Sequence, residues 1–122
     1  MQDNSDPLPS ISETAASGRT ASVFAALRET LGVAQVNLLW RCLAVDPAAL
    51  EWAWAVLEPL YAQGFLWAQA ERLQVSLPRL PAAPQELLPA DAAAIDALLA
   101  GYERANTTNL LGLLVIRRLL AG

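Results

Sequence analysis

Residues 20–50 read TASVFAALRETLGVAQVNLLWRCLAVDPAAL, and their pattern determines the fold class. Apolar residues recur at intervals of three and four, which is the spacing of a helix with one buried face. Thr20 is a residue type that caps helices, and Gly32 is one that ends them. Asp46 and Pro47 form a second starting signal, because an acidic cap and a proline at the first helical position are both favourable. The stretch predicts three successive helices, at about residues 20–31, 35–44 and from 47 to a bend or stop before Pro59.

The rest of the chain continues the helical pattern with one interruption. Four prolines between Ser76 and Ala90 exclude a long helix there. The leucines of this segment, Leu77, Leu80, Leu87 and Leu88, indicate that it packs against the protein. No alternation typical of strands occurs. The sequence therefore predicts an all-α fold, a compact bundle of about six helices. The fourth helix is expected at Tyr61–Gln74, the fifth from Asp91, and the last from Asn106 or Thr107 to about Leu120. In the fifth helix we expect the apolar residues to face inward, namely Ile95, Leu98, Leu99 and Tyr102.

The domain organisation follows from the same pattern. Residues 1–19 are polar and small, and we expect them to form a mobile tail that is pinned at Leu8 and Ile11. Residues 20–122 are expected to form a single helical domain with a proline-rich loop at 76–90. This length is enough for one domain with a modest core.

The apolar content indicates an interface. Apolar residues make up 55% of the chain and charged residues only 16%, which is more apolar surface than a small domain usually hides. Alanines on helix surfaces account for part of it, and we favour oligomerisation for the rest. Trp52 and Trp54 cannot lie on the same face of a helix, so one of them must be exposed in the monomer. An exposed tryptophan favours a partner surface.

Composition also excludes several classes of function. The net charge is −4, and no basic stripe suited to nucleic acid is present. The chain has no histidine, and Cys42 is its only cysteine. Its eight cationic residues are all arginine, so it has no lysine; this bias is typical of a GC-rich bacterial genome. Imidazole catalysis, Schiff-base chemistry and an internal disulfide are thereby excluded, and we expect no metal and no cofactor. The acidic N-terminus does not look like a signal peptide, and the longest apolar run, Leu110–Ile116, is too short to span a membrane, so we expect a cytoplasmic protein.

The remaining polar candidates lie in two places. Residues 101–109 are the most polar stretch of the C-terminal half, and Asn106 there either caps the last helix or contacts a ligand. If the helix continues through Asn106, then Tyr102 lies one turn away, about 6 Å along the axis. Gln35 and Asn37 start an otherwise apolar helix, where they either cover free backbone amides or stand beside a bound carboxylate.

The pattern resembles the DehI family, the group I 2-haloacid dehalogenases. The resemblance lies in residues 27–33 (LRETLGV), 43–47 (LAVDP) and 50–54 (LEWAW), and in residues 102–111, and it extends over about residues 20–120 apart from the proline-rich middle. Members of this family consist of two fused helical repeats with the active site between them. This chain has the length of one repeat, so the resemblance implies a homodimer with a small-organic-acid pocket between the chains.

The resemblance also implies roles for individual residues. In this family an aspartate acts as the base for a water that attacks the halogen-bearing carbon, and an asparagine of the other repeat orients that water. Asn106 falls on the asparagine position, while Tyr102 and Leu38 fall on positions that line the pocket. Gln35 falls on the aspartate position, and a shift in register would put Asn37 there. An amide cannot accept a proton near neutral pH, so the chain lacks the base of the family.

Two main functions therefore remain open from the sequence. The first is a DehI-like dimer that binds a small carboxylic acid and acts, if it is active, as a hydrolytic 2-haloacid dehalogenase. The second is a non-catalytic dimeric interaction or ligand-binding module. A peroxidase similar to the AhpD family would need a cysteine pair and a proton relay, which one cysteine and no histidine do not supply.

Overall fold

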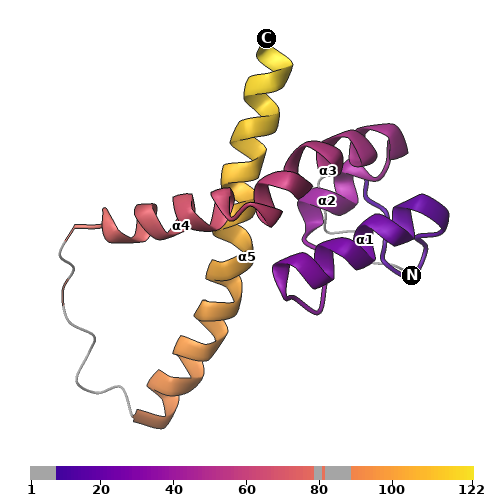
Figure 1. The fold of residues 1–122 in the computed structure, drawn as a ribbon. Helices are drawn as coiled ribbons and strands as arrows, with labels where there is room; N and C mark the ends of the chain where they lie inside the picture. Colours follow the sequence, from indigo (N-terminus) through magenta and orange to yellow (C-terminus); the bar gives the residue numbers. More distant parts are fainter. Residues whose placement is uncertain (1–7, 79–80, 82–88) are drawn as a thin grey trace. The chain divides into compact units, whose positions relative to one another are not determined.

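The computed structural model describes residues 8–78, 81 and 89–122, and all regular structure in them is helical (Figure 1). This confirms the all-α prediction. The helices are α1 (Gly18–Leu31), α2 (Leu38–Leu43), α3 (Pro47–Ala62), α4 (Phe65–Val75) and α5 (Pro89–Ala121). Contacts divide the chain into two compact units, Met1–Pro59 and Leu60–Gly122. The expectation of a single domain stays a prediction, and each unit is described by itself.

The N-terminal unit has an aromatic core. Trp40 of α2 and Trp54 of α3 meet edge to face, with ring centroids 6.0 Å apart and planes at 86°. Such pairs add about 1 kcal/mol to the burial of the two rings. One face of α1 is buried as its spacing predicts, and so is one face of α3; the buried residues are Val23, Phe24, Leu27, Leu31, Leu50, Ala53, Trp54 and Leu57. Trp52 is 40% exposed, which confirms that one of the two neighbouring tryptophans of α3 faces outward.

Capping signals locate most helix ends in this unit. Gly32 ends α1 with φ of 66°, and its N–H donates to the carbonyl of Arg28. Asp46 caps α3 as predicted, because its Oδ1 accepts from the N–H of Ala48 at 3.2 Å. The cap predicted at Thr20 is wrong: α1 begins at Gly18, where the N–H of Ala21 already donates to the carbonyl of Ser17.

α3 does not stop before Pro59, so this part of the prediction is wrong, while a bend there stays a prediction. The helix continues through Pro59 to Ala62. A proline inside a helix removes one backbone hydrogen bond and crowds the preceding turn. Leu57 and Tyr61, on either side of it, are 2% and 3% exposed. Burial of these large side chains offsets the loss at the proline.

The segment before α1 is attached to the unit through Glu13. One carboxylate oxygen of Glu13 lies 2.6 Å from Nη1 of Arg28, and the other accepts from the N–H of Val36 at 3.1 Å. The N–H of Ile11 donates to the carbonyl of Arg41, as expected for a pinned segment, whereas Leu8 is 61% exposed. Mobility of residues 1–19 stays a prediction, and the first seven lie outside the described residues.

The C-terminal unit is built on one long helix. α4 begins at Phe65, after Gly64 with φ of 78°, and crosses α5 near the middle of the longer helix (Figure 1). The fourth helix was predicted to start at Tyr61, but Tyr61 lies in the last turn of α3. α5 runs for 33 residues without a break, so the prediction of two separate helices here is wrong.

Thr108 explains why α5 does not break in its polar stretch. Its hydroxyl donates to the carbonyls of Arg104 and Ala105, both at 3.2 Å, so it is satisfied inside the helix and not at a cap. Thr108 is fully buried, and Ala105, Asn109 and Gly112 are buried beside it. Burial of this small-residue face outweighs a helix-propensity cost of about 1 kcal/mol at Gly101.

The outer face of α5 is apolar. Ile95, Leu98, Leu99 and Tyr102 were predicted to face inward, yet they are between 44% and 60% exposed. The helical period was assigned correctly, but the inner face of α5 carries small residues. Leu77 of the proline-rich loop is also exposed, contrary to expectation, while Leu80, Leu87, Leu88 and the turn expected at 85–88 lie outside the described residues. No described helix combines the length and the apolar character needed to cross a membrane.

Glu13→Gln tests the attachment of the N-terminal segment. The substitution removes the ion pair with Arg28 and weakens the hydrogen bond from Val36, so we expect the free energy of unfolding to fall by about 1–2 kcal/mol. Urea denaturation followed by tryptophan fluorescence measures this change. Glu29→Gln, at an exposed position of α1, is the control and should change stability by less than about 0.5 kcal/mol. Equal effects of the two substitutions would contradict a structural role for Glu13.

Candidate functional site

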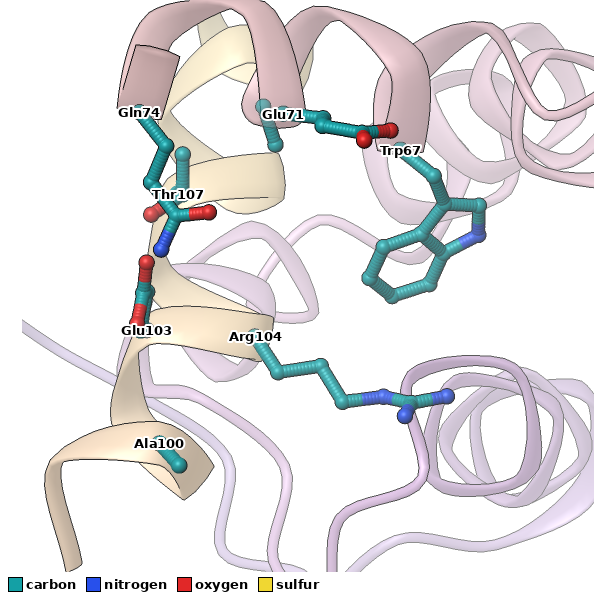
Figure 2. A pocket seen from close by; sticks show the side chains of 8 residues that line it. Trp67, Glu71, Gln74, Ala100, Glu103, Arg104 and Thr107 are labelled. Carbon is teal, nitrogen blue, oxygen red and sulfur yellow. The ribbon is translucent and has the colours of Figure 1, made fainter. Parts of the chain in front are cut away.

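A concave site of the C-terminal unit lies between α4 and α5. It has a volume of about 360 Å³ and is open to solvent. Its lining comes from two turns of each helix: Trp67, Ala70, Glu71 and Gln74 from α4, and Ala100, Glu103, Arg104 and Thr107 from α5. Figure 2 shows Gln74, Thr107 and Glu103 gathered at one end of the pocket, and Trp67 with Arg104 at the other.

Trp67 and Arg104 form the aromatic end of the pocket. The guanidinium carbon of Arg104 lies 5.2 Å from the centroid of the indole ring, within the range of a cation–π contact. Trp67 also contacts Tyr61, whose ring centroid is 5.5 Å away at an angle of 61°. Arg104 is exposed, so its contact with the indole contributes about 0.5–1 kcal/mol. The stacked pair gives the pocket a flat wall that carries positive charge.

A buried polar pair lies behind this wall. Tyr61 is 3% exposed and Thr108 is fully buried. Burial raises the pKa of the Tyr61 phenol above its ordinary value, and a hydrogen bond with the Thr108 side chain partly offsets the rise. Tyr61 therefore remains a neutral phenol throughout the physiological range and acts as a structural support for Trp67.

The pocket offers several hydrogen-bonding groups. Glu71 and Glu103 offer carboxylates, Gln74 an amide and Thr107 a hydroxyl, so a small polar molecule could form several hydrogen bonds here. The chain has no histidine, and the lining contains no thiol. In the described ranges no three metal-ligating side chains lie close enough together to hold an ion.

The residues predicted from the sequence occupy other positions. Gln35 is exposed in the connection before α2, so the prediction that the second helix starts there is wrong. Asn37 caps α2, because its Oδ1 accepts from the N–H of Leu39 at 2.9 Å, and Leu38 is the first residue of this helix. The side-chain oxygen of Asn37 is thus in structural use.

Tyr102 and Asn106 lie one turn apart on the exposed face of α5. Asn106 does not cap a helix, because α5 continues through it. Neither residue lines the described pocket, although their neighbours Glu103 and Thr107 do. Because Gln35, Asn37 and Leu38 belong to one unit and these two residues to the other, a common site for all five stays a prediction.

The polar stretch chosen from the sequence contributes to the pocket, whereas the candidates chosen in it, Tyr102 and Asn106, do not line this pocket, and their role in a site stays a prediction. Residues 101–109 were singled out, and Glu103, Arg104 and Thr107 of this stretch line the pocket. The contact between Trp67 and Arg104 joins positions far apart in the sequence, and no local pattern indicates it. The role of Glu13 carries no local signal either.

No family model, no curated protein and no solved structure matches the chain. The resemblance to the DehI family therefore stays a prediction.

The pKa of Tyr61 makes stability depend on pH in alkaline solution. Below about pH 10 the phenol is neutral in both folded and unfolded chains. Above it the unfolded phenol ionises while the buried one stays neutral, so the free energy of unfolding should fall as the pH rises. Urea unfolding at about pH 8 and about pH 11 measures the difference, which Tyr61→Phe should reduce. Tyr102→Phe, the control, leaves Tyr61 in place and should preserve it. An unchanged pH dependence in Tyr61→Phe would show that another group is responsible.

Proposed function

We propose that the chain is a helical assembly module that forms a homodimer through the exposed apolar face of α5. Large apolar side chains along this helix carry the proposal. They are Ile95, Leu98, Leu99, Tyr102, Leu110, Leu113, Leu114, Leu119 and Leu120, each between 37% and 74% exposed. More than half of the large apolar side chains that are exposed in the described residues belong to this one helix.

The positions of these residues support a continuous contact surface. Ile95, Leu99, Tyr102, Asn106, Leu110, Leu113, Arg117 and Leu120 follow one another at intervals of three or four residues. Residues at this spacing lie on one face of a helix, so they form a stripe about 38 Å long. We call this set the α5 stripe. Scattered exposed leucines are ordinary, whereas a stripe that runs almost the full length of a helix marks an interface.

The energies agree with an association of this size. Burying a leucine or tyrosine that is now about half exposed gains roughly 1 kcal/mol. Six apolar stripe residues on each of two copies then contribute on the order of 10 kcal/mol. The loss of translational and rotational freedom on association opposes this gain by at least about 4 kcal/mol. The difference corresponds to a dissociation constant in the micromolar range.

Two charged substitutions in the stripe should separate the copies. Leu99→Glu combined with Leu113→Glu places carboxylates in the proposed interface, where burial of a charge is strongly unfavourable. Sedimentation velocity at about 50 µM should show a dimer for the unmodified chain and a monomer for this variant. Ala93→Glu combined with Ala97→Glu, at exposed positions of α5 outside the stripe, is the matched control and should stay dimeric. An unmodified chain that sediments as a monomer would refute the proposal.

The hydrolytic function implied by the resemblance has its own test. We expect no chloride release from racemic 2-chloropropionate at any pH, because Gln35 cannot take the proton that the family's aspartate accepts. Ion chromatography after prolonged incubation measures chloride. Release that Asn106→Ala abolishes would instead establish a dehalogenase and would support a small-organic-acid pocket between the chains. Asn4→Ala, near the start of the sequence, is the control: it makes the same substitution away from Asn106 and should not change chloride release.

A further inference from the structure

We infer that the two copies pair with their α5 helices antiparallel. This inference rests on the proposed self-association and adds its geometry. The observation that carries it is the distribution of charge along α5. Between Pro89 and Arg104 the helix has three acidic residues and one arginine, whereas between Ala105 and Ala121 it has two arginines and no acidic residue. An antiparallel pair places the acidic half of each helix beside the basic half of the other.

The charged residues beside the α5 stripe lie mainly along one border. Asp96, Glu103, Leu110 and Arg117 follow one another at intervals of seven, so they form a row along the helix, and all four are exposed. Leu110 and Arg117 of this row also belong to the stripe. The row along the opposite border consists of Asp91, Leu98, Ala105, Gly112 and Leu119; its charge is at Asp91, and Ala105 and Gly112 are buried. We call these rows the charged edge and the opposite edge.

The two edges meet differently in the two possible orientations. In a parallel pair related by a two-fold axis, the charged edge of one helix faces the opposite edge of the other, which has no arginine, so the acidic residues find no basic partner. In an antiparallel pair, like edges face each other. Asp96 at one end of the charged edge then lies opposite Arg117 at the other end, and Glu103 lies opposite Leu110. Only the antiparallel arrangement brings Asp96 to an arginine.

The register of the stripe gives the same result. If Ile95 packs opposite Leu120 of the second copy, Tyr102 packs opposite its Leu113, and apolar residues meet along the stripe. In this register Asp96 lies two residues, or about 3 Å along the axis, from the level of Arg117 of the second copy. An arginine side chain spans this offset easily. Asn106 then lies close to the centre, where a polar residue in an apolar stripe favours one register over its neighbours.

The dipole of the helix accounts for only part of the charge pattern. Acidic residues at a helix start and basic residues at its end are favourable in any helix, but this effect fades beyond the first and last turn. Asp91 is the acidic residue of the first turn, and Arg118 is the basic residue of the last. Asp96 and Glu103 lie further inside the helix. For Asp96 the charged edge of a second copy supplies a basic partner, whereas Glu103 lines the pocket between α4 and α5.

The stripe is also large enough for a second copy. A face about 38 Å long and about 10 Å wide has a projected area of roughly 400 Å² on each copy. Accessible area exceeds projected area, so two copies approach the roughly 1,200 Å² at which specific interfaces begin. A short peptide would cover only part of this face, whereas another α5 matches it over its whole length.

A charge-exchange experiment tests the orientation on the full-length protein. Asp96→Arg alone and Arg117→Asp alone each turn two symmetric attractions into repulsions, so we expect dimerisation to weaken about tenfold in either variant. The double variant, Asp96→Arg with Arg117→Asp, restores opposite charges across an antiparallel interface and should recover the unmodified dissociation constant. Arg118→Asp is the matched control: it makes the same charge change one residue away, off the charged edge, and should alter the constant less than about threefold. Sedimentation equilibrium at low salt measures all five proteins.

A distance measurement supplies a second readout. Ala93→Cys in a Cys42→Ala background carries one spin label per chain at an exposed position of α5. In the antiparallel register the two labels lie about 40 Å apart along the axis, whereas in a parallel pair they share one level and lie less than about 30 Å apart. A short distance, or a double variant no stronger than the single ones, would overturn the antiparallel pairing and leave the homodimer standing. A monomer in every variant, as expected if the N-terminal unit of the same chain covers the stripe, would overturn both proposals.

Discussion

The length of α5 relative to its packing partners sets the properties of the C-terminal unit. α5 has 33 residues and is about 50 Å long, whereas α4 has 11 residues and is about 16 Å long. Only α4 and the last turn of α3 accompany α5 among the described residues of this unit. Two short segments cannot cover a helix of this length. The buried residues of α5 accordingly fall between Ala105 and Gly112, and apolar side chains on both sides of this region are exposed. Exposure of an apolar surface of this extent to water is unfavourable.

The middle of α5 combines two tasks on different faces. Small residues there, from Ala105 to Gly112, form the buried face, where the Thr108 hydroxyl donates to the carbonyls of Arg104 and Ala105. On the adjoining face Glu103, Arg104 and Thr107 line the pocket with α4. Tyr102 and Asn106 lie on a third face, which belongs to the α5 stripe. The pocket adjoins the α5 stripe through Glu103, which belongs to both the pocket lining and the charged edge.

The sequence predicted the elements that depend on local chemistry and missed those that depend on distant contacts. Gly32 and the Asp46-Pro47 pair mark helix ends because the cap is made by the residue itself or its immediate neighbours. Pro59 and the polar stretch around Asn106 carry equally strong local signals for a break, yet the helices continue, because buried side chains on either side outweigh a local cost. The period of α5 was evident, but its inward face was not, since the buried small residues have low hydrophobicity.

The candidate site also combines residues that the local sequence indicates with residues that only distant contacts bring in. Polar residues at 101–109 are conspicuous among apolar neighbours, and three of them line the pocket. Which of them line a pocket depends on where α4 crosses α5, and Trp67, 37 positions before Arg104, gives no sign of that crossing. Glu13 contacts Arg28 and Val36 for a similar reason, because the chain folds back on itself before α1 begins. Residue type indicates possible chemistry, and only the tertiary contacts select among the candidates.

Self-association through α5 would make assembly part of folding in the C-terminal unit. A 63-residue unit lies near the lower limit at which a chain buries enough surface to fold alone, and this one leaves its largest apolar face uncovered. Pairing would bury that face and add its free energy to the stability of each copy, so that folding and association share one equilibrium. The charges at Asp96, Glu103 and Arg117 contribute little to that energy, since exposed pairs are weak. Their effect would be on specificity, because they favour one of two orientations that the apolar stripe alone barely distinguishes.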